Sequence, residues 1–361
     1  MKIAILGTRG IPNNHGGFEQ FSESLSEYLV NKEHQVYVYN SHNHPYQEKK
    51  WKGVNIIHKY DPEDKIGTVG QFIYDLNCIS HSRKQGFDAI LQLGYTSSSI
   101  WGWLLPKDSK IITNMDGLEW KRSKYKKLVR KFLKHAEKLA VKSSDYLISD
   151  SIGIKLYLKE EYNIHSEYIA YGAKVFDKPT KEVLGIYNVI ANEYNMLIAR
   201  LEPENNIETI LEGVSKSSIN YPFLVIGKHR TKYGEYLKKK FKEDKRINFL
   251  GGIYNQNHLN NLRYFSNLYF HGHSVGGTNP SLLEAMASNA LIIADNNIFN
   301  KSILEEDAFF FENEKDIINL ITKNKNNYID ILRNNKEKII NKYDWNRINN
   351  QYEQYLFKCL E

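Results

Sequence analysis

Short apolar runs alternate with amphipathic stretches along almost the whole chain. In the first half, the apolar runs predict buried strands at Ile3–Leu6, Val36–Tyr39, Val54–Ile57, Ala89–Leu93, Lys110–Thr113 and Tyr146–Ser149. Between the first two runs, the apolar residues that recur at helical spacing are Phe18, Phe21, Leu25 and Leu29. Continuous apolar strands that alternate with helices are typical of parallel sheets covered on both faces.

The second half of the chain repeats this alternation. Its apolar runs predict strands at Met196–Ala199, Phe223–Ile226, Ile247–Leu250, Leu268–Phe270, Leu291–Ala294 and Phe309–Phe311. Helices are predicted near residues 206–217, 232–243, 256–266 and 280–288. The pattern therefore predicts an α/β protein with two doubly wound, Rossmann-like domains that face a central cleft. In such sheets the ligand lies beyond the carboxyl ends of the strands.

The boundary between the two domains is expected in Lys174–Tyr187, which is polar, contains Pro179 and lacks periodicity. The N-terminal domain is predicted at residues 1–175 and the C-terminal domain at 188–343. Residues 312–328 are rich in Asn and Lys and predict a solvated helix or loop. Residues 344–361 predict a final helix.

Composition narrows the function classes. The chain has 361 residues, 2 cysteines and a formal net charge of +7, which favours an anionic partner such as nucleic acid, a phosphorylated metabolite or an anionic membrane. Two cysteines exclude a disulfide framework and favour a reducing compartment. No apolar stretch approaches 18 residues, and the first apolar run, Ile3–Leu6, is too short for a signal peptide. We therefore expect a cytoplasmic location.

A glycine-rich loop, Gly7–Glu19, follows the first predicted strand. Its glycines allow the backbone to approach a ligand closely, and the next helix offers free N–H groups to an anion. Gly16 and Gly17 at the start of that helix are candidates for donor binding. The spacing of the glycines is not G-x-G-x-x-G, which excludes the nicotinamide fingerprint. The alternative is a tight turn between strand and helix.

A second segment, His271–Met286, runs from a strand end into a helix. Pro280 suits the first helical position and Asn279 suits the N-cap, so the amides from Gly276 to Leu282 are expected to converge on phosphate oxygens. Glu284 lies one turn further, where a carboxylate suits the two hydroxyls of a ribose. Together they indicate a nucleotide site. The alternative is a glutamate that faces solvent on a core helix.

Two cations follow neighbouring strands of the second domain. Arg200 ends the strand Met196–Ala199, where a guanidinium pairs well with phosphate, and Lys228 follows Phe223–Ile226. Either residue alone is more often a surface charge. In the first domain, Asp116 follows Lys110–Thr113 and is a candidate to orient or deprotonate an acceptor hydroxyl; the alternative is a turn residue before Gly117.

Three segments, in this order, carry a resemblance to a known family: GGFE at 16–19, ARLEPENN at 199–206 and GGTNPSLLEAM at 276–286. The chain resembles the retaining GT-B glycosyltransferases of family 4 and, more narrowly, bacterial rhamnosyltransferases of surface-polysaccharide assembly. The resemblance covers essentially the whole chain. It implies a GT-B fold with an acceptor-side N-terminal domain, a nucleotide-sugar-binding C-terminal domain and a final helix that packs back on the N-terminal domain.

The resemblance also assigns roles to residues. Arg200 matches the arginine that binds the diphosphate, and Glu284 matches the glutamate that binds the ribose. Two positions depart from the family pattern: Gly276 stands where a glutamate touches the donor sugar, and Asn205 stands where a lysine supports the diphosphate. The expected donor-binding set is Gly16, Gly17, Arg200, Lys228, His273, Gly276, Gly277, Thr278, Asn279 and Glu284. The expected catalytic set is Asp116, Arg200, Lys228 and Asn279.

By resemblance, the reaction transfers a sugar, L-rhamnose or another deoxy sugar, with retention from a dTDP- or UDP-linked donor to a lipid-linked saccharide. No D-x-D motif occurs, so we expect neither a metal nor a cofactor, and the leaving-group charge falls to Arg200, Lys228 and the helix dipole. Two alternatives stay open: a nucleotide-sugar epimerase of GT-B fold, and an inactive nucleotide-sugar-binding partner.

A basic amphipathic helix is predicted at Lys121–Lys142, which contains ten Lys or Arg residues and one acid. The residues expected to pack inward along one face are Leu128, Phe132, Ala136, Leu139 and Ala140. Such a helix is attracted to anionic lipid, so the protein is also a candidate for the inner face of the cell membrane. No nucleic-acid partner is expected, because no recognised motif accompanies the basic residues.

Overall fold

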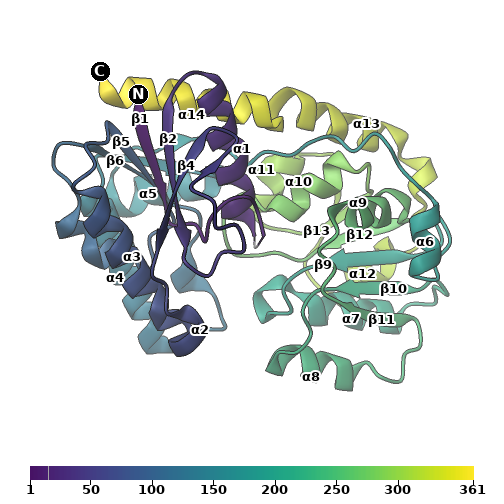
Figure 1. Ribbon diagram of the computed structural model, residues 1–361. Coiled ribbons are helices and arrows are strands. Elements are labelled where there is room, and N and C mark those ends of the chain that lie inside the picture. The colour runs from purple at the N-terminus through teal and green to yellow at the C-terminus, as the bar shows by residue number, and fades with distance from the viewer. Residues whose placement is uncertain (15) are drawn as a thin grey trace. The chain divides into compact units, whose positions relative to one another are not determined.

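The computed structural model describes residues 1–14 and 16–361, which form two compact units (Figure 1). Unit 1 comprises residues Met1–Lys121, Tyr125–Tyr171 and Trp345–Glu361. Unit 2 comprises residues Arg122–Lys124 and Gly172–Asp344. Each unit is a largely parallel sheet with its own helices, and the α/β class expected from the sequence is confirmed.

The sheet of unit 1 has the order β3-β4-β2-β1-β5-β6-β7-β8, and only the β3–β4 pair is antiparallel. Its strands are β1 (Lys2–Leu6), β2 (Gln35–Ser41), β3 (Lys50–Trp51), β4 (Val54–Lys59), β5 (Ala89–Leu93), β6 (Lys110–Asn114), β7 (Tyr146–Ser149) and β8 (Glu167–Tyr168). The central strand β1 pairs with β2 on one side and β5 on the other. The strand order reverses there, and this switch point is where doubly wound sheets bind ligands.

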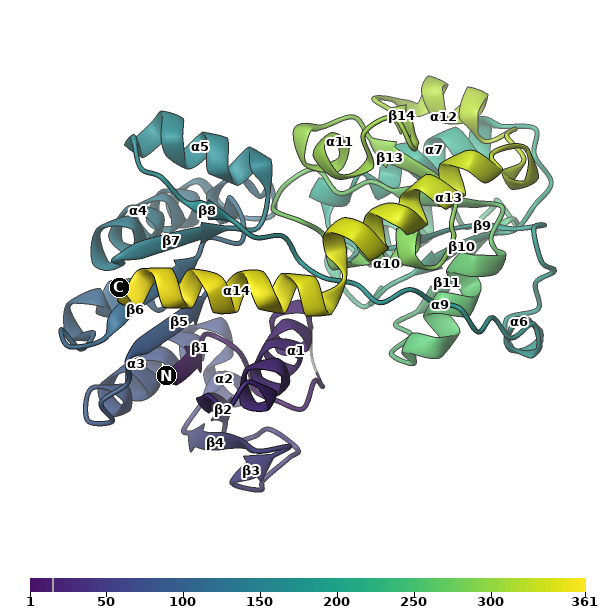
Figure 2. The ribbon, with the colours of Figure 1, turned by 90° about the horizontal axis from the view of Figure 1, so that it is seen from above.

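The helices of unit 1 include one from the far end of the sequence. They are α1 (Gly17–Asn31), α2 (Glu63–Ile66), α3 (Gly70–Ser82), α4 (Lys127–Ser143), α5 (Ile152–Tyr162) and α14 (Trp345–Leu360), with short 3₁₀ turns η1 (Gly67–Val69), η2 (Ser99–Leu104) and η3 (Glu119–Lys121). Figure 2 shows α14, in yellow, beside α1. The Tyr352 ring lies 4.7 Å from that of Phe21, and the Tyr352 hydroxyl accepts a hydrogen bond from Asn114.

The sheet of unit 2 is wholly parallel, in the order β11-β10-β9-β12-β13-β14. Its strands are β9 (Asn195–Ile198), β10 (Phe223–Ile226), β11 (Ile247–Gly251), β12 (Leu268–His271), β13 (Ile292–Asp295) and β14 (Phe309–Phe311). Its helices are α6 (Glu182–Ile186), α7 (Ile207–Lys216), α8 (Lys232–Lys240), α9 (Gln256–Phe265), α10 (Pro280–Ala287), α11 (Ile298–Leu304), α12 (Glu314–Leu320) and α13 (Ile329–Lys338), with η4 (Pro203–Asn205), η5 (Lys325–Asn327) and a π-helical turn at Ile339–Tyr343.

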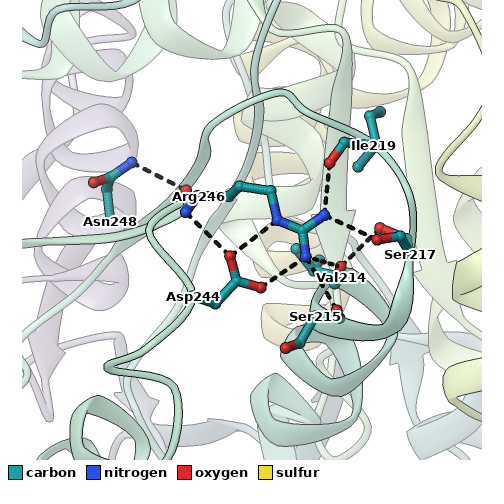
Figure 3. Close-up of polar contacts among 7 residues, drawn as sticks. All are labelled: Val214, Ser215, Ser217, Ile219, Asp244, Arg246 and Asn248. Atoms are coloured by element: carbon teal, nitrogen blue, oxygen red, sulfur yellow. Dashed lines mark hydrogen bonds and ion pairs between the residues drawn. The ribbon is translucent and has the colours of Figure 1, made fainter.

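Arg246 closes the carboxyl end of α7 (Figure 3). Its guanidinium donates to the carbonyl oxygens of Val214, Ser215, Ser217 and Ile219, at 2.6–3.1 Å. The Asp244 carboxylate accepts two hydrogen bonds from the same guanidinium, at 2.7 and 2.9 Å, and this partner lowers the pKa of Asp244. The last carbonyl groups of a helix have no partner within the helix, and its carboxyl end carries a partial negative charge. A guanidinium at this end donates hydrogen bonds to the carbonyls and balances the charge.

Two expectations about helices need correction. The polar segment 312–328 contains α12, whose Ile317 is fully buried against Gly213 of α7, so this segment packs on the core of unit 2 rather than being only solvated. The basic helix α4 begins at Lys127, not Lys121, and Leu128 and Phe132 are 80% and 37% exposed. The expected inward stripe is therefore wrong in its first two turns.

The buried side chain of Glu137 determines which side of α4 faces the interior of unit 1. Its buried carboxylate accepts hydrogen bonds from the hydroxyls of Tyr157 and Tyr162, at 2.6 Å each, and from the indole of Trp120, at 3.0 Å. Lys134 completes the cluster with an ion pair at 3.0 Å. Because a buried carboxylate must be paired, these partners anchor α4 through Glu137, and the apolar residues one turn earlier are left at the surface.

Candidate active site

The carboxyl ends of β9 and β12 meet in unit 2, and they carry the segments singled out in the sequence. These strands are neighbours in the sheet. A Cβ atom at Gly272, just after β12, would lie 2.1 Å from the carbonyl oxygen of Asn205. Only glycine permits this approach, so the loop after β12 rests directly on the loop after β9.

Arg200 and Lys228 follow the adjacent strands β9 and β10, and both side chains are exposed. Within residues 1–14 and 16–361, neither side chain is paired with a carboxylate. The Lys228 ammonium lies 5.8 Å from the centre of the Tyr254 ring. Two unpaired cations at neighbouring strand ends are therefore available to an anion.

The loop after β12 is held through its backbone at three successive residues. The Gly272 carbonyl accepts from the amide of Asn206, at 3.1 Å. The His273 carbonyl accepts from the side chains of Asn297 and Asn300, each at 3.0 Å. The amide and hydroxyl of Ser274 donate to the carbonyl of Glu204, at 3.2 and 2.7 Å. These bonds fix the loop before any ligand arrives, which lowers the entropy lost on binding.

The N-terminus of α10 has the cap that the sequence predicts, with Asn279 at the N-cap and Pro280 at the first position. The Asn279 side chain accepts from the Ser281 amide at 2.9 Å, and the Leu282 amide donates to the Asn279 carbonyl at 3.0 Å. These two amides are thus not free for phosphate, contrary to expectation. Those of Gly276 and Gly277 donate to no acceptor within the described residues, and both glycines are buried.

Glu284 is ion-paired with an arginine that the sequence analysis did not single out. Arg263 of α9 is 1% exposed, and its Nη2 lies 2.6 Å from Oε2 of Glu284 and 3.0 Å from the hydroxyl of Ser281. The Glu284 side chain is 18% exposed, so part of the carboxylate reaches the surface. The sequence shows only that Arg263 lies in a predicted helix, and nothing in it indicates that Glu284 is the partner.

Two histidines lie at the end of β12: His271 is its last residue and His273 is in the loop that follows. Burial lowers the pKa of His271 far below its usual value, and it lowers that of His273 to about 3, with the nearby charges of Arg122 and Arg200 adding to the effect. Both imidazoles are therefore neutral at pH 7. The structure places His273, Thr278 and Glu284 in one loop-and-helix segment of unit 2.

The remaining predicted residues belong to unit 1. Asp116 follows β6 beside Gly94, where a Cβ atom would lie 3.6 Å from the Asp116 carboxylate and 3.3 Å from the Phe18 ring. Gly16 is the N-cap of α1 and Gly17 its first residue. The carboxyl ends of β5 and β6 and the start of α1 are thus close together within unit 1.

Glu19 in the first turn of α1 is a further residue to which the sequence analysis gave no role. It is 5% exposed, and its Oε1 accepts from the backbone amide of Arg9 at 2.8 Å and from the hydroxyl of Thr8 at 3.2 Å. Glu19 therefore holds the Thr8–Arg9 part of the glycine-rich loop. This negative charge weakens the attraction of the α1 N-terminus for an anion, so Gly16 and Gly17 offer a poorer phosphate site than the loop of unit 2.

A hollow of about 450 Å³ in unit 2 is lined by other residues, among them Tyr264, Lys325 and Arg333. Within residues 1–14 and 16–361, no three His, Cys, Asp or Glu side chains gather as ligands for a metal ion.

Comparison with known families gives two matches. Residues 1–94 and 102–174 match a domain of unknown function, DUF1972. Residues 191–343, which include Arg200, His273 and Glu284, match glycosyl transferases group 1. No curated protein matches the chain in sequence.

Solved structures resemble the chain over almost its whole length. Sucrose-phosphate synthase from Thermosynechococcus elongatus has a TM-score of 0.80 at 17% identity, covering 99% of this chain and 98% of that one. Anabaena Alr3699/HepE in complex with UDP and glucose has a TM-score of 0.76 at 14% identity, covering 99% and 100%. A glycosyltransferase from Rickettsia africae has a TM-score of 0.73 at 14% identity, covering 100% and 99%. At these identities the likeness establishes the GT-B fold.

Proposed function

We propose that the protein transfers a sugar from a nucleoside diphosphate donor that binds at the carboxyl ends of β9, β10 and β12. The observation that carries this proposal is the placement of Glu284, one turn into α10 and behind two unpaired buried amides, Gly276 and Gly277. Glu284 would accept from the ribose hydroxyls while the amides and Arg200 bind the diphosphate. The UDP complex of the Anabaena protein supports a donor of this class.

The finer proposal follows the family resemblance. The donor sugar is a deoxy sugar such as L-rhamnose on dTDP or UDP, and the acceptor is a lipid-linked saccharide. The bond from the anomeric carbon to the diphosphate breaks while the bond to the acceptor oxygen forms on the same face. The acceptor proton passes to a phosphate oxygen. Arg200 and Lys228 stabilise the charge of the leaving diphosphate.

The second candidate function is an inactive protein that binds nucleotide-sugar without turnover. It is favoured by one observation: Asn205 and Gly276 both lack the charged side chain that the family pattern has there. Transfer to any lipid-linked acceptor would eliminate this candidate.

A thermal-shift panel with dTDP, UDP and GDP tests the nucleotide site, with NAD as the control ligand. A ligand present at about 100 times its Kd stabilises the folded state by about 2.7 kcal/mol. For a domain of this size, the expected rise in Tm is about 5–10 °C. We expect this rise with one diphosphate and none with NAD. If none of the three diphosphates raises the Tm, the protein has no nucleoside diphosphate site and the proposed function is wrong.

We further propose that unit 1 binds an anionic membrane through the surface formed by residues 126–132. All seven side chains are exposed: four cations (Lys126, Lys127, Arg130 and Lys131) and three apolar residues (Leu128, Val129 and Phe132). Within the described residues, none of the four cations is paired with a carboxylate. The Phe132 ring contacts that of Phe72 in α3, which continues the apolar part of this surface. Exposed apolar side chains between cations that have no carboxylate partner are the composition that binds at a lipid interface.

This membrane contact would be peripheral. Among the helices of residues 1–14 and 16–361, none combines the length and the apolar character needed to cross a bilayer. The surface would hold unit 1 at the membrane, where a lipid-linked acceptor is found.

Neutralising the four cations tests the membrane proposal. A variant with Lys126, Lys127, Arg130 and Lys131 changed to Gln is expected to lose binding to phosphatidylglycerol vesicles by at least about 100-fold, because each cation near the surface contributes about 1 kcal/mol. Co-sedimentation measures the bound fraction. The matched control changes four exposed lysines of unit 2, Lys232, Lys239, Lys245 and Lys315, to Gln and has the same net charge. If both variants bind the vesicles equally, the surface formed by residues 126–132 is not the membrane-binding surface.

A further inference from the structure

The two positions at which the sequence departs from the family pattern, Asn205 and Gly276, contact the same side chain. Oδ1 of Asn205 lies 2.9 Å from Nδ1 of His273. A Cβ atom at Gly276 would lie 3.1 Å from Nε2 of that imidazole, closer than side chains normally approach. Gly276 also has a φ of +131°, which L side chains rarely adopt. The absence of a side chain at 276 therefore leaves the space in which the imidazole lies.

The hydrogen bonds around Asn205 determine the tautomer of His273. Nδ2 of Asn205 donates to the carbonyl oxygen of Arg200 at 2.7 Å, and a carbonyl can only accept. Oδ1 of Asn205 therefore faces Nδ1 of His273, which must carry the proton and donate it. The other ring nitrogen, Nε2, then carries a lone pair and can only accept a hydrogen bond.

Nε2 of His273 is available to accept a hydrogen bond from a ligand. No group of residues 1–14 and 16–361 is hydrogen-bonded to it, and the residue is half-buried rather than sealed inside the unit. The backbone of His273 is fixed by Asn297 and Asn300, so the imidazole is held at both its side chain and its main chain. The pKa of about 3 keeps the ring neutral at pH 7, which preserves the lone pair.

We infer that Nε2 of His273 accepts a hydrogen bond from a hydroxyl of the donor sugar, with Asn205 and Gly276 as the residues that make this possible. The inference rests on the proposed function. Along the sequence, counted back from α10, Glu284 for the ribose is followed by the amides of Gly277 and Gly276 for the diphosphate and then by His273. This order matches the order of groups in a nucleotide-sugar. A neutral acceptor at this point binds a sugar hydroxyl without adding negative charge beside the diphosphate.

The test compares the affinity for the nucleotide-sugar with that for the nucleoside diphosphate. Calorimetry measures the Kd of UDP, UDP-glucose, dTDP and dTDP-L-rhamnose for the wild type, His273→Asn and His273→Gln. Asparagine keeps a donor to Asn205 but has no atom at the place of Nε2, whereas the glutamine amide reaches it. For the nucleotide-sugar that the wild type binds, we expect His273→Asn to raise the Kd about tenfold. The Kd of the corresponding nucleoside diphosphate should change less than twofold. His273→Gln should recover part of the loss.

The possible outcomes separate the two proposals. If the wild type binds none of the four ligands, both the proposed function and this inference are wrong. If the wild type binds while His273→Asn raises the Kd of the diphosphate and that of the nucleotide-sugar by the same factor, or changes neither Kd, only the inference is overturned. The exposed His165→Asn is the control and should leave every Kd unchanged. The Tm of each unliganded variant verifies that it is folded.

Discussion

Changing Glu284 to alanine is expected to abolish sugar transfer and, at the same time, to lower the free energy of unfolding. A carboxylate that accepts hydrogen bonds from a ribose contributes about 1.5–3 kcal/mol per bond, so the Kd of the nucleoside diphosphate should rise about 100-fold. The change also leaves Arg263, 1% exposed, without its ionic partner. Removing one member of a buried ion pair costs about 3 kcal/mol or more. Calorimetry and urea denaturation measure the two effects.

Glu284→Gln separates binding from stability. The amide oxygen still accepts a hydrogen bond from Arg263 and the volume is unchanged, so part of the lost stability should return, although the buried guanidinium still lacks a counter-charge. The ribose, however, loses the charge-assisted bond, and the diphosphate should bind about tenfold more weakly than to the wild type. The exposed Glu306→Ala serves as the control for removal of a carboxylate from unit 2. Wild-type affinity in both Glu284 variants would place the ribose elsewhere.

Changing Arg200 to alanine should reduce kcat by about 100- to 1000-fold, the usual cost of removing one group that stabilises developing charge. The Arg200 side chain is exposed and has no carboxylate partner in the described part of the chain, so its removal should leave the Tm unchanged. Steady-state kinetics at saturating donor measure the effect. Loss of activity without loss of stability is the opposite pattern to that of Glu284→Ala, which affects both.

Arg200→Lys is the graded variant in that experiment. Lysine keeps the charge but not the two parallel donors of a guanidinium, so kcat should lie between those of the wild type and of Arg200→Ala. Arg333→Ala, at an exposed arginine of the same unit, is the control. If Arg200→Ala turned over at the wild-type rate, Arg200 would have no part in stabilising the leaving group.

The sequence predicted the sheets well because their strands are short apolar runs with polar boundaries. Phe223–Ile226 and Phe309–Phe311 have the predicted bounds in the structure. The cap of α10 was also predictable, because Asn279 and Pro280 act within a single turn. In contrast, β3 and β8 have two residues each, too few to show a period, and were missed.

Interactions between residues far apart in sequence could not be predicted. The pairing of Arg263 with Glu284 joins two helices, and the bond from His273 to Asn205 joins two strand ends. Nothing in the local sequence of either member indicates its partner. The same limit explains the error in α4. Periodicity placed Leu128 and Phe132 on the inward stripe, but the polar partners of Glu137 decide which side of the helix is buried.

Helix α14 determines when unit 1 can complete its core during synthesis. Four of its side chains, Ile348, Tyr352, Leu356 and Cys359, are 1% exposed because they are packed inside unit 1. These residues are made after all of unit 2. During synthesis on the ribosome, unit 1 is therefore the last to complete its core, and the side chains that α14 covers, Phe21 among them, stay uncovered while more than 170 further residues are added.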